Sequence, residues 1–136
     1  MKPNDFINLK CTNEVQFIRM WVEFLTPFHK LTSRERDVMA RIIVQYFRLK
    51  ESIQDPEVLR DVLWSKKSRK DMMDSLDMSQ PHFQMTLAKL KKAGVIVDGT
   101  IQPRFIPHMT DNPKFVLQLY YDWSSPSNPI RKDEEE

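Results

Sequence analysis

The residue types that catalysis or metal binding requires are scarce and widely spaced in this chain. Its three histidines, His29, His82 and His108, are too far apart for two of them to ligate a metal from one helical turn. The single cysteine, Cys11, excludes an internal disulfide and any metal site built from several cysteines. We find no catalytic constellation among the carboxylates, which are scattered along helix faces. We therefore expect a protein that is not an enzyme and that uses no cofactor and no metal.

Positive charge gathers in the segment SKKSRK, which contains four basic residues that we call the basic cluster: Lys66, Lys67, Arg69 and Lys70. Such side chains bind phosphate when they stand beside the backbone N–H groups of a helix N-terminus. The same run is also typical of a loop whose charges are simply solvated. Both interpretations remain open from this segment alone.

Two short helices joined by a tight turn are predicted from the end of this cluster onward. Ser68 is placed to cap the first helix, with Asp71 three residues later as an approximate capping box. Asp77 tolerates the left-handed conformation that a tight turn needs, and Ser79 is an N-cap for the second helix. Gly94 follows as a C-cap glycine. The face of the second helix that we expect to be buried consists of Phe83, Leu87 and Leu90.

These spacings form a pattern of known type. Its members are Leu76, Met78, Ser79, Phe83, Leu87, Leu90, Lys91, Lys92, Gly94, Val95 and Ile96. The pattern resembles the helix-turn-helix half of a winged-helix DNA-binding domain, as found in many bacterial regulators and replication initiators. The resemblance implies an α+β fold: a winged helix-turn-helix with two additional N-terminal helices and a two-stranded C-terminal wing.

The resemblance also implies a function and a set of contacts. The helix spanning residues 79–93 would read base edges in the major groove of double-stranded DNA. The DNA-binding residues that it implies, beyond the basic cluster, are Ser79, Gln80, His82, Gln84, Met85, Lys89 and Arg104. Thr86 is expected near the DNA backbone together with Lys89. We therefore expect a transcription regulator or a replication initiator of plasmid or phage type.

The second motif helix departs from this family in a way that favours an alternative. Between Ser79 and Ala88 there is no arginine or lysine, although recognition helices of the family usually carry at least one. Pro81 also removes one N–H that would otherwise be able to meet a phosphate. The alternative is a winged-helix module that binds another protein within a larger assembly, such as a scaffold or a phage virion component.

Three further helices are predicted upstream. The first covers residues 13–25, ends at Pro27 and has an apolar face wide enough either for a core covered on two sides or for a homodimer contact. The second covers residues 33–50 behind a capping box of Thr32 and Glu35, and its polar residues are Arg34, Asp37, Arg41, Gln45 and Arg48. The third begins at Asp55-Pro56 and ends near Trp64. Its expected buried residues are Val58, Leu59, Val62 and Leu63.

The C-terminal part is expected to form strands. Residues 95–97 lead into the turn dipeptide Asp98-Gly99, residues 100–107 are expected to be extended, and residues 115–121 to form a strand. The last two segments would form the wing, joined by a loop at residues 111–113, with Arg104 at its start and Lys114 at its return. We expect one domain over residues 1–123, followed by a linker and acidic tail over residues 124–136.

Charge and hydropathy agree with a nucleic-acid partner and exclude a membrane protein. The net charge is only +2, but the last four residues are all acidic, so residues 1–132 carry +6. No run approaches the length of a transmembrane helix, and residues 1–10 lack the apolar core of a signal peptide. We therefore expect a soluble, cytoplasmic protein.

Overall fold

The computed structural model describes residues 8–110, 113, 115 and 121–124. The elements in chain order are α1 (Glu14–Phe24), α2 (Thr26–His29), α3 (Ser33–Lys50), α4 (Pro56–Leu63), α5 (Lys66–Leu76), α6 (Gln80–Lys92), β1 (Ile96–Val97), β2 (Thr100–Ile101) and the 3-10 helix η2 (Pro103–Phe105). The described part is therefore mostly helical with a small two-stranded antiparallel sheet, which is compatible with an α+β fold.

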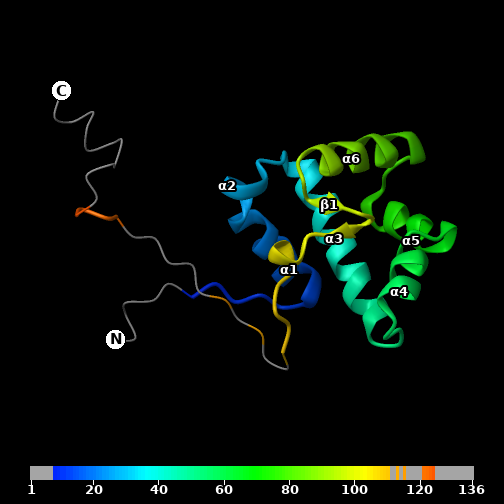
Figure 1. The fold of residues 1–136 in the computed structure, drawn as a ribbon, viewed down its shortest axis with the longest axis horizontal. Coiled ribbons are helices and arrows are strands. Elements are labelled where there is room, and N and C mark those ends of the chain that lie inside the picture. The colour runs from blue at the N-terminus through cyan, green and yellow to red at the C-terminus, as the bar shows by residue number, and fades with distance from the viewer. Residues whose placement is uncertain (1–7, 111–112, 114, 116–120, 125–136) are drawn as a thin grey trace.

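Helix α3 is the centre of the molecule. It contacts α1, α4, α5 and α6, and Figure 1 shows it running behind the hairpin between α1 and α2 on one side and α4 and α5 on the other. The predicted capping box at its start is confirmed: the Thr32 hydroxyl accepts a hydrogen bond from the Glu35 N–H, and the Glu35 carboxylate accepts one from the Thr32 N–H. Its buried residues occupy most of its circumference: Val38, Met39, Ala40, Ile42, Ile43, Val44 and Gln45.

Helix α1 has the wide apolar face that its sequence predicts, and the chain covers that face on two sides. Ile18 and Val22 are fully buried, and α1 packs on α3. Around α1, the ring of Phe115 lies 5.1 Å from that of Trp21 in an edge-on contact, and the Trp21 indole donates to the Phe105 carbonyl at 2.8 Å. Intramolecular contacts thus occupy much of the face that a homodimer would use.

The prediction for the end of this helix is wrong in detail. Pro27 does not terminate α1, which ends at Phe24; it lies in the first turn of α2 instead. Proline is favoured at the start of a helix because the N–H that it lacks has no intrahelical partner there. The α2 residue His29 is buried and satisfied, since its Nε2 faces the Val22 carbonyl at 2.9 Å and its Nδ1 accepts from the Leu31 N–H at 3.0 Å.

Helix α4 starts where Asp55-Pro56 predicts, with the Asp55 carboxylate accepting from the Glu57 N–H. Leu59 and Leu63 are buried as expected, whereas Val62 is half-buried. Val58 is 47% exposed, so its predicted burial is wrong. This short helix packs on α3 and α5 and buries only the stripe that carries residues 59 and 63.

The only regular strands in the described ranges belong to a tight hairpin, in which Ile96 pairs with Ile101 and Val97 with Thr100. Asp98 and Gly99 both have positive φ, +54° and +77°, as the predicted two-residue turn requires. Residues 100–107 are not extended throughout, which corrects that prediction. The strand stops at Ile101, and Pro103 begins the 3-10 turn that buries Phe105.

Several predictions fall on residues outside the described ranges. They concern residues 111, 112, 114 and 116–120 of the expected wing, residues 125–136 of the expected tail, and the N-terminal residues 1–7. Of the described residues in the expected wing, Phe115 packs on the aromatic side chains of α1. Within the described part of the chain, no helix is both long and apolar enough to span a membrane.

Candidate functional site

The basic cluster lies on a helix and not in a loop, which corrects the expected start of this element. Helix α5 begins at Lys66 because Ser65 is its cap, accepting a hydrogen bond from the Ser68 N–H. The predicted cap, Ser68, is buried instead, and its hydroxyl accepts from the Gln45 side chain of α3 at 3.1 Å. Lysine and arginine are good helix formers, so the basic run extends the helix to the preceding serine.

Members of the basic cluster differ in how free their charges are. Lys66 and Lys67 are exposed and, within the described part of the chain, have no ion-pair partner. Lys70 pairs with Asp74 of the next turn at 3.3 Å. Arg69 is half-buried, and its Nε is buried without a hydrogen-bond partner among the described residues. Two unpaired lysines in the first turn of a helix also oppose the helix dipole, so a bound anion would stabilise this end of α5.

The turn between α5 and α6 has the geometry that its residues predict. Asp77 is left-handed with φ +51°, Met78 is buried, and Ser79 caps α6 by accepting from the His82 N–H. Arg34 of α3 supports this turn by donating to the Leu76 carbonyl. The orientation of α6 is therefore set both by its own cap and by a contact from the central helix.

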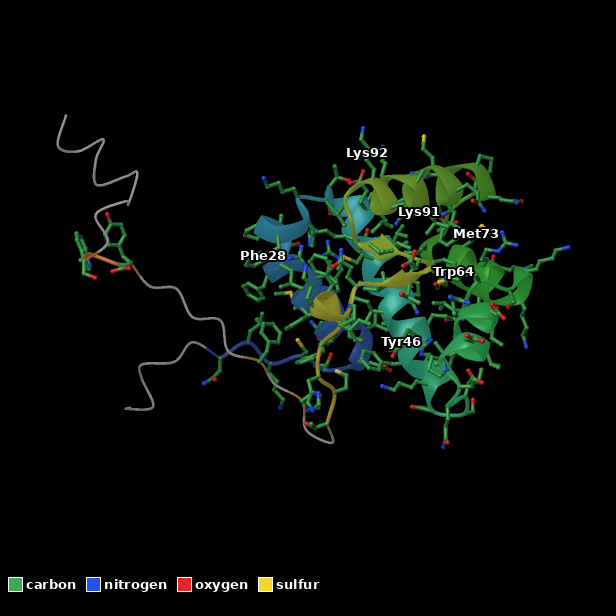
Figure 2. All side chains as sticks on the ribbon, in the orientation of Figure 1. Phe28, Tyr46, Trp64, Met73, Lys91 and Lys92 are labelled. Carbon is green, nitrogen blue, oxygen red and sulfur yellow. The ribbon has the colours of Figure 1, made fainter. Side chains whose placement is uncertain are left out.

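Helix α6 turns its predicted apolar face into the core. Phe83 and Leu90 are fully buried and Leu87 is nearly so. Thr86 is buried as well, and its hydroxyl donates to the His82 carbonyl at 2.9 Å. It is therefore not available to a DNA backbone, contrary to the expectation. Figure 2 shows α6 along one edge of the molecule, with Lys91 and Lys92 at its C-terminal end.

The exposed face of α6 carries the residues that the resemblance implies. At 100° per residue, Gln80 and Gln84 lie on one flank of this face, and His82 and Lys89 lie on the other. Between the two flanks stands Met85, whose side chain is 55% exposed. The exposed face of α6 is therefore a row of two amides and a row of His and Lys, separated by a thioether.

Two of the residues expected to contact DNA, Lys89 and Arg104, differ from the expectation. The Lys89 ammonium is 3.7 Å from Glu35 at the start of α3, so its charge already has a partner. Arg104 is exposed but lies on η2, with its guanidinium 4.6 Å from the ring centroid of Phe105. Because Phe105 is tied to Trp21 and His29, Arg104 belongs to the side of the molecule near α1 and α2. It is not on a wing strand.

A second charged surface was not predicted as a site. Arg34, Arg41 and Arg48 recur every seven residues on α3, and they line the solvent-facing stripe of this otherwise buried helix. We call the depression along this stripe, bordered by α1 and, at its Arg34 end, also by α5, the arginine groove. Sequence patterning grouped Gln45 with these arginines among the polar residues, but Gln45 is buried against Ser68. The seven-residue repeat is the signal that separates the arginines from Gln45.

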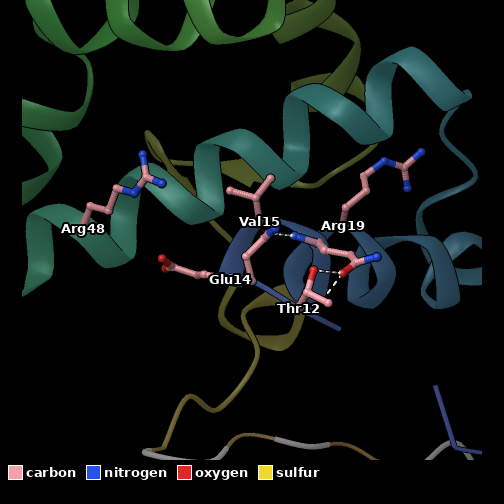
Figure 3. A pocket seen from close by; sticks show the side chains of 7 residues that line it. Thr12, Glu14, Val15, Arg19 and Arg48 are labelled. Carbon is pink, nitrogen blue, oxygen red and sulfur yellow. Dashed lines mark hydrogen bonds between the residues drawn. The ribbon is translucent and has the colours of Figure 1, made fainter. Parts of the chain in front are cut away.

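The arginine groove has two adjoining hollows that share Val15 and Arg19 in their walls. One, of about 260 Å³, is lined by Arg34, Asp37 and Arg41 of α3 together with residues at the end of α5. The other, of about 820 Å³, lies between Arg48 and the N-terminal turn of α1, where Thr12 and Glu14 line it (Figure 3). Burial, and after it the positive charge of Arg48, lowers the pKa of Arg41, while Glu14 acts in the opposite direction.

Comparisons with protein-family models, with curated proteins and with solved structures find no match. Within the described residues, no group of three or more histidine, cysteine or carboxylate side chains is placed to hold a metal ion.

Proposed function

We propose that this chain is a non-enzymatic DNA-binding protein of winged-helix type that presents α6 to the major groove of duplex DNA. The observation that carries the proposal is the orientation of α6. Behind a capped three-residue turn, the side chains that the resemblance assigns to bases are exposed, and those that it assigns to the core are buried. A helix so presented is able to place side chains against base edges.

Phosphate contacts in this proposal come from the start of α5. Lys66 and Lys67 are exposed, unpaired within the described ranges and close to the first N–H groups of a helix. Base reading comes from Gln80 and Gln84, because an amide side chain is able to donate to adenine N7 and accept from its N6 amino group. Since α6 has no arginine, we expect modest sequence discrimination and a large share of affinity from phosphate neutralisation.

One observation favours a second function. The centre of the exposed face of α6 is occupied by Met85, with Pro81 and Ala88 one turn away on either side. Exposed methionine adapts to apolar partners, and small neighbours allow close approach. This makes α6 a candidate docking helix for another protein, in which case the lysines of α5 serve solubility.

The test is fluorescence anisotropy of a labelled random-sequence duplex at several salt concentrations. Log affinity is expected to fall linearly with log salt, with a slope of about −0.9 for each phosphate neutralised. Replacing both Lys66 and Lys67 with glutamine should make that slope shallower by about one unit for each phosphate that is no longer neutralised.

The matched control also removes two positive charges, but at the C-terminal end of α6, by replacing both Lys91 and Lys92 with glutamine. The slope of log affinity against log salt should stay closer to the parental value in that variant than in the α5 variant. Absence of binding by the parent at low salt refutes DNA binding and favours the protein-docking function. Equal weakening in the two variants refutes the assignment of phosphate contacts to α5.

A further inference from the structure

The arginine groove contains two guanidinium groups that the described part of the chain leaves unpaired. Arg19 pairs with Asp37 at 2.8 Å and Glu23 at 3.2 Å, and Arg34 pairs with the other oxygen of Asp37 at 3.5 Å. Arg41 and Arg48 have neither an ion-pair nor a hydrogen-bond partner among the described residues. Asp37 is thus already shared by two arginines. Arg48 is exposed and Arg41 is half-buried, and the charge of Glu14 offsets only part of the unfavourable environment of Arg41.

Arg41 and Arg48 are also neighbours that destabilise each other. They are one heptad apart on α3, or about 10 Å along the helix axis, and on the same side of it. Arg41 is half-buried, so its charge is less well hydrated than a surface charge, and the nearby Arg48 adds repulsion. An external anion held between them would relieve both effects, because a guanidinium forms paired hydrogen bonds to carboxylate.

The groove is on a different face from α6. Helix α6 reaches α3 through the pair of Lys89 and Glu35, and Glu35 is about 120° from Arg41 around the α3 axis. Helix α5 lies between the two, since Ser68 of α5 contacts Gln45 of α3. A ligand in the groove therefore does not need the exposed face of α6, and binding there is independent of the proposed DNA binding.

From this arrangement we propose that the arginine groove is a docking site for an extended acidic segment of a partner protein. Three residues of a chain in the extended polyproline II conformation complete one turn and advance about 9 Å, so carboxylates at positions i and i+3 lie on one face at roughly the spacing of Arg41 and Arg48. The walls also suit a peptide, because Val15, Ala40 and Leu76 supply apolar surface between the charges.

A nucleic-acid backbone fits the groove less well. Asp37 and Glu14 stand among the arginines and would repel a polymer that carries a charge at every unit. A peptide whose acidic residues are spaced brings fewer negative charges close to Asp37 and Glu14 than such a polymer does.

The test uses a fluorescein-labelled peptide with glutamate at every third position and serine or alanine between. A second peptide of the same composition carries its glutamates in one run. Binding to the full chain is measured by anisotropy at fixed low salt.

Replacing both Arg41 and Arg48 with glutamine should weaken binding of the spaced peptide roughly tenfold or more, since two charge-assisted hydrogen-bonding groups are removed. The matched control is replacement of both Lys66 and Lys67 with glutamine, which removes the same charge from α5 and should change affinity by less than roughly twofold.

The parent should prefer the spaced peptide over the contiguous one. Arg48 is exposed and has neither an ion pair nor a side-chain hydrogen bond among the described residues, so replacing it alone should preserve the fold and weaken binding in part. The proposal is overturned by any of three results: no binding of the spaced peptide to the parent, equal weakening in the α3 and α5 variants, or equal binding of the two peptides. Reduced duplex-DNA affinity in the α3 variant with peptide binding retained would assign the groove to nucleic acid instead.

Discussion

Replacing Phe83 with alanine tests the orientation of α6, on which the proposed DNA contacts depend. Phe83 is fully buried and faces the core, while Met85, two residues later on the same helix, is 55% exposed. If α6 were rotated so that residue 83 faced a ligand, the two positions would exchange roles. The pair of variants Phe83→Ala and Met85→Ala therefore distinguishes the two orientations.

The magnitude follows from burial. A buried aromatic side chain removes about 150–250 Å² from water, which at about 25 cal/mol per Å² corresponds to about 4–6 kcal/mol. Alanine retains a small part of this, so Phe83→Ala should lower the free energy of unfolding by about 3–5 kcal/mol. Met85→Ala should change it by no more than about 0.5 kcal/mol, because truncating an exposed side chain uncovers little surface.

The assay is equilibrium unfolding in urea followed by circular dichroism, with the slope compared between variants. Because a domain of this size has about 5–15 kcal/mol of stability in total, a milder variant is needed if alanine unfolds the protein. Phe83→Leu should then cost about 1–2 kcal/mol. Parental unfolding behaviour in Phe83→Ala, combined with abolished ligand binding, would refute the orientation of α6 described here.

Two further predictions concern the same helix. Replacing both Gln80 and Gln84 with alanine should relax base preference by about 1–3 kcal/mol for each bidentate base pairing removed while leaving the salt slope unchanged, as measured by binding selection from a random duplex library; an unaltered preference would show that α6 does not read bases. Gly94 has φ +79°, and an added Cβ would meet only the Gln102 side-chain nitrogen at 3.7 Å, so Gly94→Ala should cost about 1–2 kcal/mol from backbone strain alone. Urea unfolding measures that cost, and an unchanged midpoint would contradict the left-handed assignment.

Local signals predicted the elements of this fold where the chemistry of a few neighbouring residues decides the outcome. The capping box of Thr32 and Glu35 marks the start of α3, and Asp55-Pro56 marks the start of α4. The turn at Asp77 and the Ser79 cap are predicted equally well from the sequence, because a left-handed residue and a side-chain acceptor each act within three or four positions of the chain. Such features depend little on the remainder of the chain.

Errors arose where a residue had two local uses and packing chose between them. Ser65 and Ser68 are both able to cap α5. The Ser68 hydroxyl instead accepts a hydrogen bond in the core from the side chain of Gln45 of α3, which is 23 positions away in the chain. Val58 fits an apolar helix face, but α4 meets its neighbours with the stripe of Leu59 and Leu63 only. Neither choice is visible from spacing.

The properties of the candidate sites also divide into those that the sequence determined and those that the tertiary structure decided. Sequence by itself determined which face of α6 is buried, because Phe83, Leu87 and Leu90 recur at helical spacing and burial of apolar surface dominates the free energy of folding. Only the tertiary structure decided that Lys89 is paired with Glu35, that Arg104 lies beside α1 and α2, and that Arg41 and Arg48 are left without partners within the described residues. The physical reason is that the state of a charge depends on which groups from distant parts of the chain come within a few ångströms of it, and the order of residues does not state those distances.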